Sequence, residues 1–152
     1  MRTPSSKFSL TRSSHKTRGA LTAPRYVWND RKQFGQLVGE FQGMQHQIAQ
    51  SYTEIAAARH LVYNAARKKE AGEDFVMDAA MAKLYASQVA GRVSGLAVEW
   101  MGGMGFVREG LAEKYWRDSK IGAIYEGTSN IQYVKPPFCL IPRSLLTRAP
   151  LG

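Results

Sequence analysis

The residues of this chain best suited to acid–base chemistry lie between Ile124 and Gln132, in the stretch Ile-Tyr-Glu-Gly-Thr-Ser-Asn-Ile-Gln. Its carboxylate, Glu126, stands between apolar residues and a run of polar residues that typically cap helices. A partly desolvated carboxylate just before a helix N-terminus is tolerated by the helix dipole and can act as a general base. Alternatively, Glu126 is a solvated turn residue before a helix cap at Thr128 or Ser129. This stretch alone favours the second interpretation.

Four further motifs precede this stretch and change its interpretation. They are Arg31-Lys32-Gln33-Phe34-Gly35, Phe41-Gln42-Gly43-Met44-Gln45, Glu99-Trp100-Met101-Gly102-Gly103-Met104-Gly105-Phe106 and Glu113-Lys114-Tyr115-Trp116-Arg117-Asp118. Together with the Glu126 stretch, this series resembles the C-terminal helical domain of the flavin-dependent acyl-CoA dehydrogenases. The resemblance covers residues 26–132 without an obvious insertion or deletion. Five motifs in the right order are far more specific than any one of them.

The resemblance implies FAD as the cofactor. Arg31 matches an arginine that meets the FAD pyrophosphate, and a guanidinium fork suits a diphosphate; the alternative is a solvated residue at a helix start. Gln42 matches a further FAD contact or is one more exposed polar residue. The Gly102-Gly103 loop follows a helix, whereas a dinucleotide-binding fingerprint follows a strand. The loop is therefore either a plain turn or, as the resemblance implies, a backbone segment that approaches the FAD of a neighbouring subunit. The remaining FAD positions that the resemblance implies are Glu99, Trp100, Met101, Thr128, Ser129 and Asn130.

The resemblance also implies a reaction, the α,β-dehydrogenation of a short or 2-methyl-branched acyl-CoA thioester. Glu126 would remove the α-proton while a hydride leaves the β-carbon for the flavin, and Gly127 would leave room for the thioester. Such a role belongs to fatty-acid and branched-chain amino-acid catabolism. The implied partners are the acyl-CoA substrate, an electron-transfer flavoprotein as electron acceptor, and further copies of the chain (the family tetramer) or a full-length homologue.

The net charge of +9 lies entirely in the flanks. Residues 1–25 hold six Lys or Arg and residues 133–152 hold three, with no acidic residue in either segment, so residues 26–132 carry equal numbers of acids and bases. A nucleic-acid-binding domain would place its basic excess on the folded part, which argues against that function. No apolar run is long enough to span a bilayer. A single cysteine, Cys139, rules out an intramolecular disulfide and fits a reducing compartment.

Composition divides the chain into three segments. Residues 1–25 are rich in Arg and Ser and free of acids, which is typical of a mitochondrial transit segment or of a disordered basic tail. A transit segment would direct the protein to the mitochondrial matrix. Residues 26–132 form the family-like helical domain. Residues 133–152 contain four prolines and predict an irregular tail.

Apolar periodicity predicts helices from Phe34 to about Ala66, from Asp74 to Met101, from Gly110 to Gly122, and from Thr128 onward. The first has a basic last turn (residues 67–69) followed by Gly72 as its C-terminal stop, and in the second the apolar residues, such as Val89 and Val93, repeat every four positions. No segment alternates with period two, so we expect an all-α, up-and-down helical bundle. His15, His46 and His60 lie in separate segments without metal-ligand spacing, so no metal site is expected.

Family members also have an N-terminal helical domain and a β-domain, and the resemblance covers neither. Most of the first helix of the family's C-terminal bundle is also unmatched before Phe34, so we expect an incomplete bundle. A second function remains open on these grounds, that of a non-catalytic helical module that associates with itself or with a full-length acyl-CoA dehydrogenase.

Overall fold

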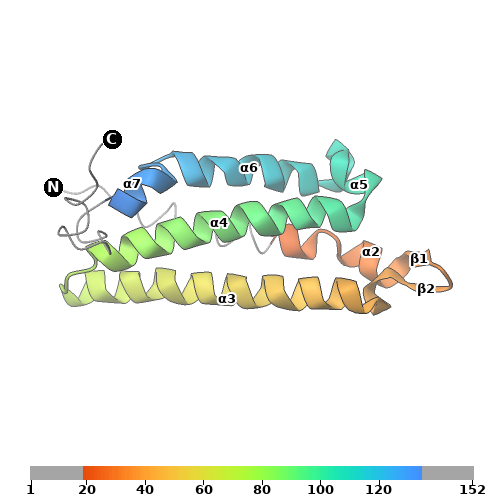
Figure 1. Cartoon of the computed structure of the whole chain (residues 1–152), viewed down its shortest axis with the longest axis horizontal. Helices are drawn as coiled ribbons and strands as arrows, with labels where there is room; N and C mark the ends of the chain where they lie inside the picture. The colour runs from red at the N-terminus through yellow and green to blue at the C-terminus, as the bar shows by residue number, and fades with distance from the viewer. Residues whose placement is uncertain (1–18, 135–152) are drawn as a thin grey trace, which may run out of the picture.

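The computed structural model describes residues 19–134. Its long helices α3, α4 and α6 run side by side, with α4 in the middle (Figure 1). This arrangement confirms the predicted all-α bundle. Residues 19–22 are helical, and the elements that follow are α2 (Arg25–Asp30), β1 (Lys32–Gln33), β2 (Gln36–Leu37), the 3-10 turn η1 (Val38–Glu40), α3 (Gln42–Ala71), α4 (Val76–Met101), α5 (Gly103–Phe106), the 3-10 turn η2 (Arg108–Gly110), α6 (Ala112–Ile124) and α7 (Ser129–Val134).

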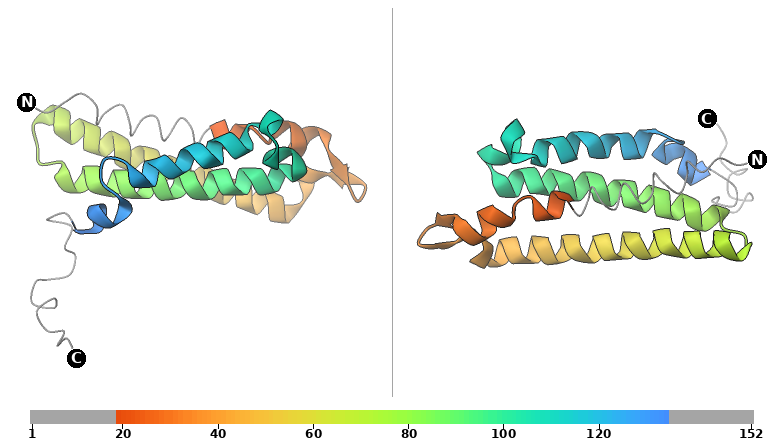
Figure 2. Two further views of the ribbon diagram at one scale, coloured as in Figure 1. Left: turned by 90° about the horizontal axis from the view of Figure 1, so that it is seen from above. Right: turned by 180° about the vertical axis from the view of Figure 1, so that it is seen from behind.

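The central helix α4 packs against both α3 and α6 and carries most of the core (Figure 2). Its predicted repeat of four is confirmed, because Val89, Val93 and Ala97 are all buried. On the side facing α6 the contact is made by small residues, and the Ser94 hydroxyl donates to Oγ of Ser119 over 3.1 Å. Small side chains let the two helices approach closely, which fixes the end of α6 over the first half of α4.

The predicted C-terminal end of the first long helix is confirmed. α3 ends at Ala71, and Gly72 adopts a left-handed conformation with φ 75°. The Glu73 N–H donates to the Lys68 carbonyl over 3.0 Å, which is the pattern of a glycine-capped helix end. Lys68 and Lys69 lie in the last turn, where cations interact favourably with the helix dipole. With 30 residues, α3 is about 45 Å long.

The predicted start of that helix at Phe34 is wrong. Phe34 and Gly35 have φ values of 52° and 84°, and they form the two-residue turn of the hairpin β1–β2. Positive φ at both central positions is the turn geometry that matches the twist of a tight hairpin. Helical spacing of the apolar residues was misleading here, because Phe34 is 96% exposed and packs in no core. The close approach of α2 also leaves no room for a side chain at Gly39, because a Cβ there would lie 2.9 Å from the Trp28 carbonyl oxygen.

Residues that precede the predicted domain boundary at residue 25 contribute to the core of the described structure. Ala20 is fully buried and Leu21 nearly so, and both belong to the core cluster. Residues 19–25 are therefore part of the folded domain. At the other end α7 continues to Val134, two residues past the predicted boundary. The rest of the two basic flanks, including Cys139, lies outside the described residues, so the transit segment and the irregular tail stay predictions.

Candidate active site

The candidate cofactor residues Arg31 and Gly102 lie together at the hairpin end of the bundle. Arg31 directly follows α2 and Gly102 directly follows α4. A Cβ built on Gly102 would lie 3.5 Å from Nη1 of Arg31, and the adjacent Gly103 has open space around its Cα. An exposed guanidinium therefore stands beside two exposed glycines. A flexible cation next to uncovered backbone fits a diphosphate group.

Two tryptophans hold these segments together. Trp28 of α2 and Trp100 of α4 meet edge to face, with ring centroids 5.6 Å apart. The Trp100 Nε1–H donates to Oε1 of Gln47 over 2.8 Å, which ties α4 to α3. Trp100 and Met101 are 5% and 0% exposed, so their side chains belong to the core. At these two predicted FAD positions, only backbone atoms remain available to contact a cofactor.

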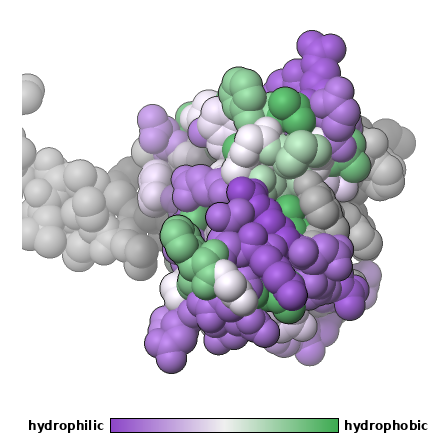
Figure 3. Space-filling model, turned by 90° about the vertical axis from the view of Figure 1, so that its right-hand side faces the viewer, coloured by the Kyte–Doolittle hydropathy of each residue, from purple (hydrophilic) through white to green (hydrophobic). Residues whose placement is uncertain are grey.

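Gln42 and Glu99 are exposed near the same end of the bundle. Gln42 is the first residue of α3, and Glu99 lies in the last turn of α4. The surface at this end is largely hydrophilic with scattered apolar patches (Figure 3). Exposed apolar residues in the hairpin and around α5 are Phe34, Met104, Phe106 and Val107.

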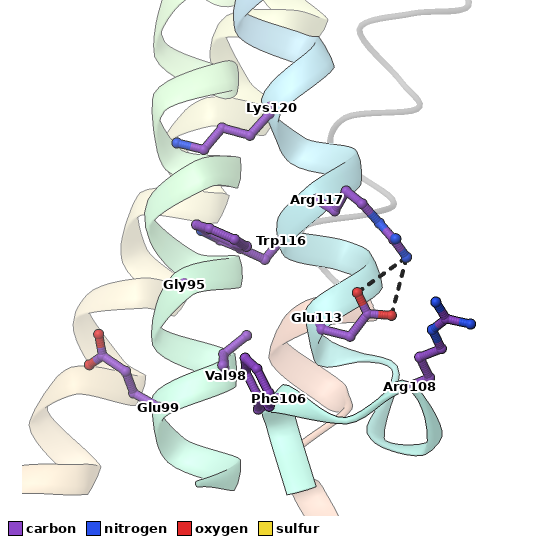
Figure 4. A pocket seen from close by; sticks show the side chains of 9 residues that line it. All are labelled: Gly95, Val98, Glu99, Phe106, Arg108, Glu113, Trp116, Arg117 and Lys120. Carbon is purple, nitrogen blue, oxygen red and sulfur yellow. Dashed lines mark hydrogen bonds and ion pairs between the residues drawn. The ribbon is translucent and has the colours of Figure 1, made fainter. Parts of the chain in front are cut away.

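A groove of about 800 Å³ runs between α4 and α6 near α5 (Figure 4). Glu99 lines it, as do Val98, Phe106 and Trp116. On α6, one side of the groove, the Arg117 guanidinium pairs with the Glu113 carboxylate four residues earlier at 3.2 Å (Figure 4). Glu99 is the one predicted site residue among those that line this groove, so the groove is largely separate from the predicted cofactor and catalytic residues.

Glu126 lies in the turn between α6 and α7, at the opposite end of α4. Its side chain is exposed, so the described chain does not supply the partial desolvation expected of a base. Its backbone is unusual, because φ is 55° in a residue other than glycine. The next residue, Gly127, has φ 98°, and its carbonyl oxygen accepts hydrogen bonds from Lys83 Nζ at 2.5 Å and from Gln132 Nε2 at 3.2 Å.

These two hydrogen bonds account for the strained turn. A left-handed conformation costs a side-chain-bearing residue about 1–2 kcal/mol. A hydrogen bond from a charged donor contributes about 1.5–3 kcal/mol, so the bond from Lys83 is large enough to hold Glu126 in place. Strained backbone that the surroundings enforce is common at functional sites. Gly127 also has little room for a side chain, because a Cβ would lie 2.9 Å from Nε2 of Gln132.

The polar residues after Gly127 lead into α7. Ser129 is its first residue, and the Gln132 N–H donates to the Thr128 carbonyl over 3.2 Å. Thr128 and Asn130 are exposed, and Ser129 is half-buried. The residues from Glu126 to Asn130 thus lie in the turn before α7 and in the first two positions of α7.

One chain does not bring the two groups of candidate residues together. Lys83, which contacts the Glu126 turn, and Met101, which precedes Gly102, are 18 positions apart on the same helix. At 1.5 Å per residue this separation is about 27 Å. The candidates around Arg31 and Gly102 (the cofactor group) and those from Glu126 to Asn130 (the catalytic group) therefore occupy opposite ends of α4.

Comparison with known proteins decides the family. The family model described as the C-terminal domain of acyl-CoA dehydrogenase matches residues 13–134. This chain belongs to the acyl-CoA dehydrogenase family.

Among curated relatives of this acyl-CoA dehydrogenase domain, the mitochondrial short/branched chain specific acyl-CoA dehydrogenase of Rattus norvegicus is 55% identical over 103 residues, which are 68% of this chain and 24% of that protein. A short-chain specific acyl-CoA dehydrogenase of Clostridium acetobutylicum is 44% identical over 114 residues, which are 75% of this chain and 30% of that protein. The chain therefore spans 24% to 30% of the length of these relatives.

Solved structures share the fold of this acyl-CoA dehydrogenase domain. Butyryl-CoA dehydrogenase from Megasphaera elsdenii superposes with a TM-score of 0.81 at 38% identity, over 84% of this chain and 33% of that one. The FAD complex of PigA superposes with a TM-score of 0.78 at 26% identity, over 90% of this chain and 34% of that one.

Sequence reasoning overlooked two residues of this acyl-CoA dehydrogenase domain that hold the Glu126 turn, Lys83 and Gln132. A signal for Lys83 exists, since it is a charged residue between the buried Ala82 and Leu84 in the most apolar helix. Gln132 is 3% exposed, which no pattern in its short helix reveals.

Two structural findings bear on other kinds of site. Within residues 19–134 no three His, Cys, Asp or Glu side chains gather in a way that could hold a metal ion. Over the same residues, none of the helices is both long and apolar enough to cross a bilayer.

Proposed function

We propose that this domain is part of an FAD-dependent acyl-CoA dehydrogenase in which Glu126 is the general base. The observation that carries the proposal is the Glu126 turn, where a carboxylate is held in a strained conformation by hydrogen bonds from α4 and α7. Membership of the family supports the same reaction.

The residues at the hairpin end fit the diphosphate of FAD. The Arg31 guanidinium would bind the phosphates, and the exposed backbone at Gly102 and Gly103 would allow the cofactor to approach closely. Gln42 and Glu99 stand near enough to this end to add polar contacts. When bound, the flavin would accept the hydride that leaves the β-carbon of the substrate.

The residues at the other end would handle the proton. The Glu126 carboxylate would accept the α-proton of the thioester, and its backbone N–H would donate to the thioester oxygen as charge develops there. Gly127 presents no side chain to the substrate. Thr128, Ser129 and Asn130 would contact the flavin from the start of α7.

Two copies of the chain would complete a site that one copy cannot. The cofactor and catalytic groups lie about 27 Å apart on α4, so the Arg31 end of one copy would serve the Glu126 end of another. We therefore propose that the protein works as a homo-oligomer or together with a full-length homologue.

The relatives suggest the substrate, the electron acceptor and the location. Those with the greatest identity act on short or branched-chain acyl-CoA, which favours a short or 2-methyl-branched acyl-CoA here. One relative is the CarC subunit of a caffeyl-CoA reductase–Etf complex, which favours an electron-transfer flavoprotein as acceptor. The rat and cow relatives are mitochondrial, which favours a mitochondrial location.

A second candidate function is that of a non-catalytic helical module that packs on itself or on a full-length acyl-CoA dehydrogenase. The observation that favours it is the exposure of large apolar side chains on α6 and α7. Ile121, Ile124 and Ile131 are 49%, 59% and 48% exposed. Apolar residues clustered on a surface mark interaction sites more often than isolated ones do.

Flavin retention tests the cofactor assignment. The purified chain is incubated with FAD and passed through a sizing column, and flavin absorbance is measured under the protein peak. We expect co-elution with an oligomer, and a large loss of flavin in Arg31→Ala. Arg67→Ala is the matched control, because Arg67 is an exposed arginine at the opposite end of α3. A folded oligomer without flavin would favour the helical module.

Flavin bleaching by a short-chain acyl-CoA tests the base. Glu126→Gln removes the proton acceptor while keeping the size of the side chain, so we expect bleaching to stop without loss of helicity. Glu109→Gln, an exposed glutamate near the other end of the bundle, should leave bleaching unchanged. Unchanged bleaching in Glu126→Gln would remove this residue from the mechanism.

A further inference from the structure

We propose that Lys83 is the positioning residue for Glu126. Its ammonium group fixes the turn that carries the carboxylate by donating to the Gly127 carbonyl, without itself contacting the substrate. This inference rests on the proposed function, because a positioning role has meaning only if Glu126 is the base.

The placement of Lys83 is the first support. It lies in α4 between two buried residues, Ala82 and Leu84, and is itself half-buried. Lysine is among the residues least often buried, because ordering its long side chain costs entropy and its charge prefers water. A lysine held in a packed helix therefore needs a compensating partner, which the Gly127 carbonyl supplies 44 positions away in the chain.

The convergence of donors on a single carbonyl is the second support. A carbonyl oxygen has two lone pairs, and at Gly127 one accepts from Lys83 of α4 and the other from Gln132 of α7. These two bonds set the orientation of the peptide group between Gly127 and Thr128. The turn is thereby fixed to the central helix, not only to the helices that flank it.

The unusual backbone of Glu126 is the third support. A residue with a side chain leaves the left-handed region readily unless its surroundings hold it there. Because only Gly127 separates Glu126 from the bonded Gly127–Thr128 peptide, release of the Gly127 carbonyl would let the φ of Glu126 relax and would turn its carboxylate away. Displacement of a catalytic group by about 1 Å can lower a rate by two orders of magnitude.

The test compares Lys83→Met, Lys83→Arg and Lys120→Met in the full chain. Lys83→Met keeps the length of the side chain and removes the donor, Lys83→Arg restores a charged donor, and Lys120→Met removes an exposed lysine of α6 as the matched control. The primary measurement is amide hydrogen exchange at Tyr125 and Gln132, the N–H groups on either side of the turn that donate to the Ile121 and Thr128 carbonyls. Amides in the middle of α3 serve as the internal reference.

We expect Lys83→Met to raise exchange at the turn by roughly 10- to 100-fold, the factor that corresponds to the loss of one charge-assisted hydrogen bond. The α3 amides should not change, and Lys83→Arg should recover most of the protection. Flavin retention should fall far less than in Arg31→Ala, because Arg31, the proposed diphosphate ligand, lies at the far end of α4. In flavin bleaching by a short-chain acyl-CoA, the maximal rate should fall while the half-saturating substrate concentration stays the same.

Unchanged exchange at the turn in Lys83→Met would overturn the proposal, even if Glu126 proved to be the base. An equal rise in exchange at the turn and in α3 would also overturn it, because that result indicates a general structural role. If Lys83→Met fails to fold, Lys83→Gln replaces it: its shorter, neutral side chain removes the charge-assisted bond, so exchange at the turn should again rise, and unchanged exchange would overturn the proposal. Failure of the proposed function would show separately, as unchanged bleaching in Glu126→Gln.

Discussion

Trp28 and Trp100 meet edge to face with an angle of 66° between their rings, and this contact attaches α2 to the end of α4. Arg31 follows Trp28 by three residues, and Gly102 follows Trp100 by two. The geometry of the candidate cofactor site is therefore set by a contact at the edge of the core.

Trp28→Ala should separate the two segments and destabilise the domain. We expect a loss of roughly 2–3 kcal/mol in the free energy of unfolding, at or below the low end for a core tryptophan because Trp28 is only partly buried. Flavin retention should fall with it. Urea denaturation followed by circular dichroism measures the stability, and the sizing-column experiment measures the flavin.

Trp28→Phe is the informative control. The indole Nε1 of Trp28 is buried without a hydrogen-bond partner, so its removal leaves no polar group newly unpaired. We expect Trp28→Phe to stay within about 1 kcal/mol of the parent chain, since an aromatic pair is retained. A loss as large as that of Trp28→Ala would show that the edge-to-face contact is not what joins α2 to α4.

Phe34→Asn should stabilise the domain. Phe34 is 96% exposed with φ 52°, and it precedes Gly35 in the hairpin turn. Asn-Gly is the preferred pair for this turn, and asparagine tolerates positive φ better than phenylalanine does. We expect a gain of about 1 kcal/mol, measured as a higher midpoint in thermal unfolding. A lower midpoint would mean that Phe34 makes a stabilising contact in the assembled protein.

The ion pair between Lys68 and Asp78 should make stability depend on alkaline pH. Their Nζ and Oδ2 atoms are 2.8 Å apart, and the hydrogen bond to Asp78 raises the pKa of Lys68 above 10.5. A raised pKa in the folded state means that this stabilisation is fully present below pH 10.5. It is lost as the pH rises through the folded-state pKa.

Thermal unfolding between pH 9 and pH 12, compared between the parent chain and Lys68→Met, isolates this contribution. The two curves should differ by a constant amount up to about pH 10.5 and converge above it. A difference that stays constant across the whole range would contradict the assignment. Asp78→Asn should behave like Lys68→Met, because it removes the other partner.

Two glycines, one in the interior of α4 and one in α5, should respond oppositely to alanine. Gly91 lies inside α4 with open space around its Cα, so Gly91→Ala should stabilise the domain by about 0.5–1 kcal/mol through helix propensity. A Cβ on Gly105 would lie 2.5 Å from the Val98 carbonyl oxygen, so Gly105→Ala should destabilise it by roughly 2 kcal/mol. Chemical denaturation of both variants measures the contrast, and a destabilised Gly91→Ala would contradict it.

The helices whose ends carry chemical signals could be predicted from sequence. Gly72 and the basic residues before it marked the end of α3, and Gly102 marked the end of α4. The start of α3 carried no such signal, because Phe34, Leu37 and Val38 have helical spacing although they lie in a hairpin and the 3-10 turn after it. Local spacing cannot distinguish these structures when the deciding contact, that of Gly39 with Trp28, comes from a different element.

The sequence by itself determined the helical class, the family and the identity of the candidate residues, because apolar periodicity and motif order are local properties of the chain. Tertiary structure alone decided how those residues are distributed. It placed Arg31 against Gly102 and placed Glu126 at the other end of α4, and it joined Lys83 to Gly127 across 44 positions. Such pairings depend on how helices pack in three dimensions, and side-chain spacing along one helix holds no information about its neighbours.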